Sequence, residues 1–253
     1  MVRCAWTIAV LTSKEECFFY IIVIGMIKKL WWPVELILVI AIFGILLKMI
    51  RFFELNYYHY LISAQTIILI GYTLFLILAI FKIIQASKNN THSLQYIFKN
   101  KFLPKDIWLV LLILAVVGTY KFIVKIEFVQ IFSLVKPVPF SNLTSFQSLS
   151  LIFLTAISLP IGVIAEELYF RGYLFDIQNI RFKKYTWIVN GFSWSIYHIL
   201  TPTNFLAFLP TCLVYSYIYQ KRRNIWITIV AHLIGNSLAY YAVFKSLLLH
   251  SIG

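Results

Sequence analysis

Long apolar runs constrain this chain more than any other feature, because most of its residues lie in hydrophobic stretches separated by short basic connections. A helix needs roughly 20 apolar residues to cross a hydrocarbon layer about 30 Å thick, where only helices and closed barrels satisfy their backbone groups. The sequence therefore predicts an all-α fold, a polytopic transmembrane helical bundle of about seven spans, with no sizeable soluble domain. The predicted spans are Leu30–Leu47, Tyr57–Phe81, Ile107–Val124, Leu149–Gln178, Tyr185–Leu200, Phe205–Tyr219 and Ile225–Phe244.

The amino-acid composition also indicates a protein embedded in a lipid bilayer. Of the 253 residues, 61% are apolar and 12% are charged, which is unusual for a soluble globular domain. A formal net charge of +13 would favour a nucleic-acid partner in a soluble protein, but here the basic residues lie mostly in loops between apolar runs. We therefore expect them to meet the lipid bilayer and its anionic headgroups, and we expect no nucleic acid among the partners.

The basic loops alternate along the chain. If the loop after the second span is cytoplasmic, thirteen lysines and arginines fall on the cytoplasmic side and six on the other. This asymmetry follows the positive-inside rule and supports an odd number of spans from Leu30 onward. We expect a multi-pass protein of the cell membrane, and the many isoleucine, lysine and asparagine residues favour a bacterial source.

Ionisable side chains inside the spans form a second constraint, because charged groups are costly in hydrocarbon and mark functional sites. In the fourth predicted span, Glu167 and Arg171 are four residues apart and share a helix face, so the arginine can neutralise that glutamate. Glu166 points about 100° away and is the less compensated carboxylate, which makes it the candidate general base. The alternative is that both glutamates form ion pairs that only hold helices together.

Two further spans carry imidazole and amide groups. His198 ends the run Gly-Phe-Ser-Trp-Ser-Ile-Tyr-His, with Trp194 one turn earlier on the same face. His232 and Asn236 are four residues apart, so they share a face and form two neighbouring neutral donors of the kind that stabilises an oxyanion. With a rise of about 1.5 Å per residue, Glu166, His198 and His232 all fall inside the hydrocarbon layer, toward its cytoplasmic half.

These residues resemble the CAAX-protease and bacteriocin-processing family of intramembrane proteases, also called the CPBP or Abi family. Its pattern is EExxxR, FxxxH and HxxxN on separate transmembrane helices. Glu166–Arg171 matches the first motif in full, and His232–Asn236 matches the third. In the second motif His198 is present, but Trp194 stands where the family has phenylalanine, a change that keeps an aromatic wall. The resemblance covers about Leu149–Phe244.

The resemblance implies a glutamate-type intramembrane endopeptidase that hydrolyses a peptide bond in a membrane-tethered peptide or protein. Glu166 and His198 would activate a water molecule, and the pair His232 and Asn236 would stabilise the tetrahedral oxyanion. The residues expected to support the site are Glu167, Arg171 and Trp194.

On this interpretation the chain is one membrane domain in three segments. Residues 1–29 are an uncertain N-terminal segment, 30–148 hold the N-terminal transmembrane helices and loops, and 149–253 hold the catalytic helices. Because Cys17–Ile27 is too short to span a membrane, two interpretations of the first segment stay open. It is an interfacial or signal-like helix, or a stretch that precedes a natural start at Met26. For the bundle as a whole, eight spans are the alternative to seven.

No metal or other cofactor is expected, because the sequence has no HExxH motif and asparagine is a poor zinc ligand but a good oxyanion donor. The alternative is zinc, held by Glu166, His198 and His232, which are all admissible ligands. The three cysteines form no CxxC pair, so neither a disulfide framework nor a zinc-thiolate site is expected.

Two other functions compete with hydrolysis. In one, the protein is a bacteriocin self-immunity factor that acts by binding, and the polar cluster only locks helices together. In the other, it is a small transporter or proton-coupled channel, since intramembrane acids and histidines also relay protons. The sequence has a single motif-bearing half and no repeat symmetry, which argues against a transporter.

Overall fold

The computed structural model describes residues 31–42, 46, 61–88, 97–123, 143–198 and 205–252. All regular elements within these ranges are helices, which confirms the predicted all-α class for this part of the chain. The chain divides into two compact units, Met1–Val39 and Ile40–Gly253. All of the predicted site residues belong to the second unit, whereas the predicted segment 1–29 lies outside the described residues.

The helices from Leu61 onward are joined by short connections where the structure describes them. In chain order they are α2 (Leu61–Lys88), the 3₁₀ turn η2 (Pro104–Asp106), α4 (Ile107–Ile123), α5 (Ser145–Glu167), the π-helical turn η5 (Leu168–Leu174), α6 (Phe175–Phe182), the 3₁₀ turn η6 (Lys183–Tyr185), α7 (Thr186–Tyr197), α8 (Phe205–Arg222) and α9 (Ile225–Ile252).

The described helices lie where spans were predicted, with shifted ends. Two stretches of consecutive helical residues are long and apolar enough to cross a membrane by length and composition, Gln65–Ser87 and Ser145–Tyr197. The second stretch includes the turn between α6 and α7. Trp31–Ile42 and Ile225–Leu238 are shorter apolar helices. Helix formation is therefore confirmed in the described part of each predicted span, and the number of seven membrane crossings stays a prediction.

A capping box fixes the start of α5. The side-chain oxygen of Thr144 accepts a 3.2 Å hydrogen bond from the backbone nitrogen of Gln147, whose own side-chain oxygen accepts a 2.9 Å bond from the backbone nitrogen of Thr144. These reciprocal bonds satisfy donors that have no partner inside the helix. The start of α5 then determines how far along the helix axis the two glutamates at its other end lie.

The predicted span Leu149–Gln178 is wrong in one respect, because it is not a uniform α-helix. After Glu167 the chain widens into the π-helical turn η5 and returns to α-helix at Phe175. In this turn backbone N–H groups bond five residues back, as Phe175 does to the carbonyl oxygen of Phe170. Turns of this kind occur frequently at functional sites, and this one begins directly after the two glutamates.

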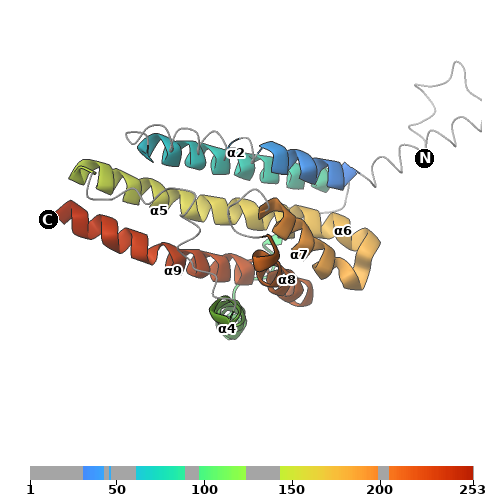
Figure 1. Ribbon diagram of the computed structural model, residues 1–253. Helices are drawn as coiled ribbons and strands as arrows, with labels where there is room; N and C mark the ends of the chain where they lie inside the picture. The colour runs from blue at the N-terminus through green and yellow to red at the C-terminus, as the bar shows by residue number, and fades with distance from the viewer. Residues whose placement is uncertain are drawn as a thin grey trace, which may run out of the picture. The chain divides into compact units, whose positions relative to one another are not determined.

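Helix α5 lies between α2 and α9 (Figure 1). Gln65 on α2 donates a 2.7 Å hydrogen bond from Nε2 to Oγ of Ser158 on α5. Elsewhere in the bundle, α7 packs against α8 at Gly191, where an added Cβ would lie 3.0 Å from the Cα of Leu213. Small residues that let helix backbones approach this closely are typical of membrane bundles.

Large apolar side chains cover the outer face of α2. Ile70, Leu74, Ile77 and Phe81 recur at three- or four-residue spacing, and each is more than half exposed. An apolar stripe of this length is unfavourable in water and suits a hydrocarbon environment. Exposed large apolar residues on the other long helices include Trp108, Leu112, Phe153, Leu238 and Leu249.

Two ion pairs tie the connection between α8 and α9 to other parts of the bundle. Arg222 Nη2 lies 2.8 Å from Oδ1 of Asp106 in η2, and Arg223 Nη1 lies 2.6 Å from Oδ1 of Asp176 in α6. Both aspartates are buried and both arginines are partly exposed, so the charges meet at the rim of the bundle. Because α9 starts directly after this connection, the contacts fix the position from which His232 projects.

Candidate active site

Two adjacent carboxylates stand where α5 passes into the π-helical turn, and each has its own partners. The Glu166 side chain faces α7, where Trp194 Nε1 donates a 3.0 Å hydrogen bond to its Oε2. His198 Nε2 lies 3.7 Å from the same oxygen, which is longer than a direct hydrogen bond. The fold thus brings residues of two separate sequence motifs together around one buried carboxylate.

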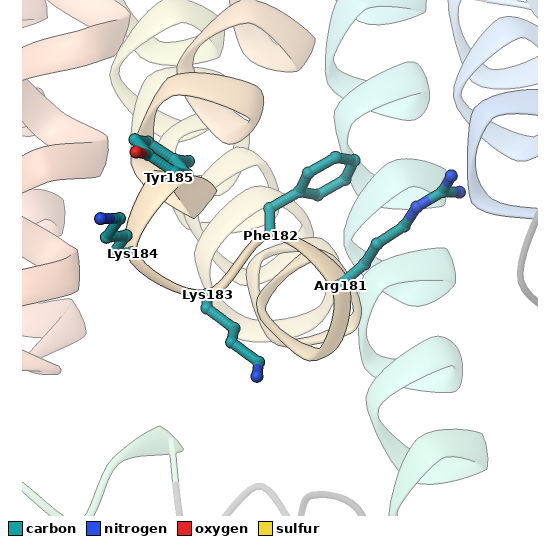
Figure 2. Close-up of a pocket in the computed structure, with 5 residues that line it drawn as sticks. All are labelled: Arg181, Phe182, Lys183, Lys184 and Tyr185. Atoms are coloured by element: carbon teal, nitrogen blue, oxygen red, sulfur yellow. The ribbon is translucent and has the colours of Figure 1, made fainter.

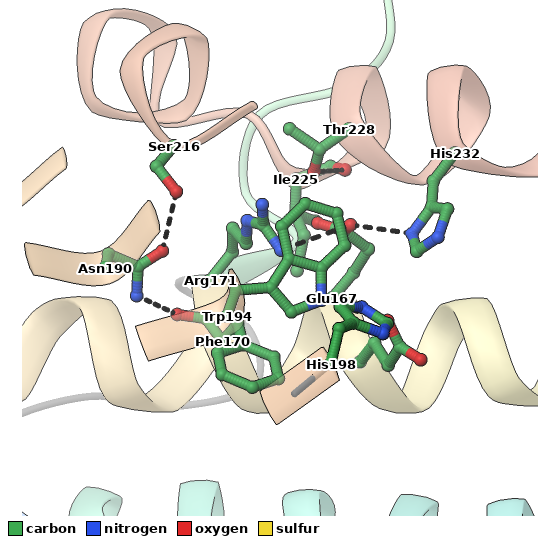
Figure 3. Close-up of polar contacts among 11 residues, drawn as sticks. Glu167, Phe170, Arg171, Asn190, Trp194, His198, Ser216, Ile225, Thr228 and His232 are labelled. Carbon is green, nitrogen blue, oxygen red and sulfur yellow. Dashed lines mark hydrogen bonds and ion pairs between the residues drawn. The ribbon is translucent and has the colours of Figure 1, made fainter. Parts of the chain in front are cut away.

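Glu167 lies between a cation and an imidazole. Its Oε1 is 3.4 Å from Nη1 of Arg171 and 3.0 Å from Nδ1 of His232, and the glutamate and arginine side chains are fully buried. Figure 3 shows Arg171 and His232 reaching Glu167 from opposite sides. The sequence paired Glu167 with Arg171 and placed His232 beside Asn236, so the contact between Glu167 and His232 is a finding of the structure.

The contact with Glu167 determines which proton His232 carries. A carboxylate accepts hydrogen bonds, so Nδ1 of His232 donates to Oε1 of Glu167. In the neutral ring the other nitrogen, Nε2, then has a lone pair and no proton. For Nε2 to donate at the same time, both ring nitrogens must carry protons. The expected donor pair of His232 and Asn236 stays a prediction.

Asn236 lies one turn beyond His232 on α9, in line with the predicted shared face. Its side chain is half-buried, and the structure shows no hydrogen bond from it to any of the described residues. Glu166, by contrast, lies within electrostatic range of His232, Glu167 and Arg171. Six of the seven predicted site residues thus form one contact network, and the seventh, Asn236, follows His232 by one turn of α9.

Trp194 occupies the centre of this network, which the sequence did not predict. Its indole N–H bonds Glu166, and the guanidinium carbon of Arg171 lies 3.8 Å from the centroid of its ring. The rings of His232 and His198 approach it with centroid distances of 5.3 and 5.8 Å. Trp194 was expected only to preserve an aromatic wall, but a phenylalanine has no N–H to donate. The sequence did contain a signal for this role. Trp194 is an N–H donor one helical turn before His198, and the preceding apolar span carries two acidic residues that need donors.

A polar network behind the site holds the π-helical turn. Asn190 Nδ2 donates a 2.8 Å hydrogen bond to the carbonyl oxygen of Phe170 within the turn and a 3.1 Å bond to Oε1 of Gln178. Ser216 donates a 3.0 Å bond to Oδ1 of Asn190, so the amide bridges the turn and α8, as Figure 3 shows. Gln178 in turn donates a 2.9 Å bond to Ser193. These partners come from several helices, so sequence spacing alone gave no role to Asn190 or Gln178.

Aromatic rings close the site on the side of α2 and α8. Phe75 on α2 contacts Tyr169 and Tyr197, with centroid distances of 5.2 and 5.7 Å. His198 stacks on Phe208 of α8 at a centroid distance of 4.9 Å. These rings surround the polar groups with apolar surface, which excludes water and strengthens electrostatic interactions inside the site. None of them was identified from the sequence as part of the site.

The arrangement does not form a metal site within the described residues. No group of three or more histidine, cysteine, aspartate or glutamate side chains there has the geometry to hold a metal ion. Of the alternative zinc ligands, Glu166 and His198 lie near each other, but His232 directs Nδ1 at Glu167. The expectation of no metal or other cofactor stays a prediction.

An open hollow forms at the turn between α6 and α7, away from the carboxylates. It is lined by five consecutive residues, Arg181 to Tyr185, and Figure 2 shows their basic side chains pointing in different directions. The ammonium of Lys184 lies 5.0 Å from the ring centroid of Tyr185. Since the basic groups do not converge on one point and no predicted site residue lines the hollow, we assign it no part in catalysis.

Comparison with known proteins agrees with the motifs. Residues 147–238 match a family described as Type II CAAX prenyl endopeptidase Rce1-like. The matched segment runs from α5 into α9 and contains all seven predicted site residues, which confirms the resemblance to the CAAX-protease family over this segment. No curated protein and no solved structure gave a significant match.

Proposed function

Because residues 147–238 match the Rce1-like family, we propose that the chain is a multi-pass membrane endopeptidase that cleaves a membrane-tethered peptide or protein. The single observation that carries the proposal is the different environment of two adjacent carboxylates. Among the described residues, Glu167 forms a direct ion pair with the Arg171 cation, whereas Glu166 accepts a hydrogen bond from the Trp194 indole and lies near the His198 imidazole. An acid that forms no direct ion pair with Arg171 and lies beside a histidine is suited to proton transfer.

Glu166 and His198 would act together on a water molecule. The 3.7 Å between Oε2 and Nε2 is too long for a direct hydrogen bond and suits two groups that hold one water between them. Glu166 would accept a proton as this water attacks the scissile carbonyl carbon, and would then deliver it to the leaving amine. The indole N–H of Trp194 keeps the carboxylate oriented through these steps.

The oxyanion that forms on the scissile carbonyl needs donors on its other side. His232 and Asn236 would supply them from one face of α9. Because Nδ1 of His232 is committed to Glu167, the nitrogen that would meet the oxyanion is Nε2, donating as an imidazolium. Glu167 and Arg171 therefore support catalysis by fixing the ring and its charge. In this mechanism all proton transfers run through side chains, which is the glutamate-type alternative to zinc.

The membrane setting is part of the proposal. The two long apolar helices and the exposed apolar stripe on α2 support a protein embedded in lipid. The distribution of basic loops supports a cell-membrane orientation in which the site opens toward the cytoplasmic half. A substrate anchored by a lipid chain or by its own apolar segment would reach the carboxylates along the bilayer.

The test is cleavage by purified protein in detergent micelles, with quenched fluorescent peptides that end in a farnesylated CAAX sequence and matched peptides without the farnesyl group. Wild-type protein should cleave, and Glu166→Gln should reduce kcat by roughly a hundredfold or more, the usual range for losing a general base. Asp106→Asn is the matched control, because Asp106 is a buried carboxylate that pairs with Arg222 at the rim of the bundle. Cleavage by Glu166→Gln at the wild-type rate would contradict the proposal.

One observation favours self-immunity by binding as a second candidate. The pair Glu167 and His232 joins α5 to α9, as expected of a polar contact whose only role is to lock helices together. The two functions separate in cells exposed to a bacteriocin. If Glu166→Gln is expressed normally and still protects, binding is the function. Loss of protection at normal expression indicates hydrolysis.

A further inference from the structure

Helix α2 lies outside the segment that matches the Rce1-like family, yet it packs along α5 beside the glutamates. Its contact with α5 has a polar bond at Gln65 and aromatic contacts at Phe75. Between these two positions α2 carries Tyr72. This tyrosine has no role in the three motifs or in the mechanism described above.

The Tyr72 ring rests against Gly162 of α5. A Cβ added to Gly162 would lie 2.9 Å from three ring atoms, Cδ2, Cε2 and Cζ, of Tyr72. The contact includes Cζ, the atom that carries the hydroxyl group. Gly162 is four residues before Glu166, so the two share one face of α5. The missing side chain at Gly162 therefore lets a phenol group lie one helical turn from the candidate base.

A second hydroxyl approaches from the opposite neighbour of α5. Tyr240 lies on α9, one turn beyond Asn236 and on the same face. Tyr72 and Tyr240 both lie close enough to Glu166 for their hydroxyl groups to interact electrostatically with it, and they also interact with each other. Hydroxyl groups from α2 and α9 thus lie within electrostatic range of the carboxylate of α5.

We propose that Tyr72 is a positioning residue of the Glu166 site, whose hydroxyl group orients the carboxylate and its water for attack. The inference rests on the proposed hydrolytic function. It assigns α2 a specific part in the active site, although α2 lies outside the family segment. Phe75, one turn further along α2, has no hydroxyl and supplies packing against Tyr169 and Tyr197.

The first experiment removes the hydroxyl group and keeps the ring. Tyr72→Phe should lower kcat roughly tenfold, leave KM within about twofold, and leave the thermal unfolding temperature in detergent unchanged. A residue that only packs would not produce a loss confined to kcat, because phenylalanine fills the same space. Tyr217→Phe is the matched control, since Tyr217 is 42% exposed on α8 and contacts Trp187 rather than the site.

The second experiment tests the contact with Gly162. Gly162→Ala should displace the Tyr72 ring and lower kcat by a similar factor, because the added methyl group cannot fit at 2.9 Å. In a Tyr72→Ala background the space is free, so Gly162→Ala should then have little further effect. Independent losses that multiply in the double variant would contradict the proposed contact.

The outcomes separate this inference from the proposed function. If Glu166→Gln is inactive while Tyr72→Phe keeps the wild-type kcat, the role of Tyr72 is wrong and hydrolysis by Glu166 stands. If Glu166→Gln cleaves like the wild type, or the wild type cleaves none of the peptides, the proposed function fails and the role of Tyr72 fails with it. A tenfold loss in Tyr72→Phe, with Glu166→Gln inactive, supports both.

Discussion

The indole nitrogen of Trp194 lies 3.0 Å from Oε2 of Glu166, so an aromatic residue of α7 directly holds the candidate base of α5. The same ring lies under the guanidinium group of Arg171, which is ion-paired with the neighbouring Glu167. One side chain therefore contacts both the free acid and the cation that neutralises the other acid. The separate environments of the two carboxylates depend on this tryptophan.

Replacing Trp194 with phenylalanine should separate its hydrogen bond from its packing. Trp194→Phe keeps a ring near Arg171 but leaves Glu166 without the indole donor. A hydrogen bond to a charged group contributes about 1.5–3 kcal/mol to stability, so we expect the free energy of unfolding to fall by about that amount and kcat to fall roughly tenfold or more. Steady-state cleavage of the farnesylated peptide measures the effect on kcat. Trp194→Leu, which also removes the ring, should lower stability further. Full activity in Trp194→Phe would show that the indole bond is unimportant.

Removing the cation beside Glu167 should destabilise the protein more than it changes any single kinetic constant. Arg171→Met leaves a fully buried carboxylate without its positive partner, which costs about 3–5 kcal/mol in comparable buried pairs. Unfolding by SDS titration in mixed micelles measures this cost. The double variant Arg171→Met with Glu167→Gln should recover part of the loss.

The exposed Arg181 of α6 provides a matched control for that experiment. Arg181→Met removes the same charge from the surface and should change the free energy of unfolding by about 0.5 kcal/mol or less. Equal losses from Arg171→Met and Arg181→Met would contradict the ion pair in the core.

Glu167 and His232 should behave as one unit in catalysis. Each of Glu167→Gln and His232→Gln should lower kcat, because the first replaces the charged acceptor of the imidazole with a neutral amide and the second removes the imidazole itself. The double variant should be no less active than the less active of the two single variants, since both changes weaken the same donor. A thermodynamic cycle built from the four kcat values measures this coupling. Fully multiplicative losses would mean that the two residues act independently.

Asn190 should be required for the shape of the site although it touches no reacting group. Asn190→Ala leaves Oε1 of Gln178 and the hydroxyl of Ser216 without the amide that bonds them, and it removes the side-chain bond that ties the π-helical turn to α7. Buried groups left unpaired cost about 1–3 kcal/mol each, so stability and kcat should both fall. The control is Asn179→Ala, whose side chain accepts one 3.2 Å bond from Thr186 away from the site and should change kcat little. Similar kinetics in both variants would contradict a role for Asn190 in holding the turn.

The parts of this molecule that follow from local spacing could be predicted from the sequence. The apolar runs gave the helices, because hydrocarbon permits few other backbone structures. The four-residue spacing of Glu167 and Arg171 predicted their ion pair. The helical periodicity of about 100° per residue also predicted that Glu166 points in a different direction. Three short motifs in order predicted the resemblance to the CAAX-protease family, which the match over residues 147–238 confirms for that segment.

The parts that depend on how helices meet could not be predicted. His232 was assigned to Asn236 because both lie on one helix, whereas its 3.0 Å contact is with Glu167 on another. The widening after Glu167 has no periodic signature, since it is held by Asn190 from α7. Tyr72 lies far from every motif in sequence and reaches α5 only because Gly162 leaves room for its ring.

The π-helical turn also sets the rotation of everything that follows it in the same helical rod. Each residue of an α-helix advances about 100° around the axis, and a π-turn accommodates one residue more than an α-turn would. If the seven residues Leu168–Leu174 formed a regular α-helix instead, α6 would therefore be rotated by about that angle. Asp176 would turn away from Arg223, and Gln178 away from Ser193. The width of one turn thus acts as the angular setting that aligns the two ends of the rod with different neighbours.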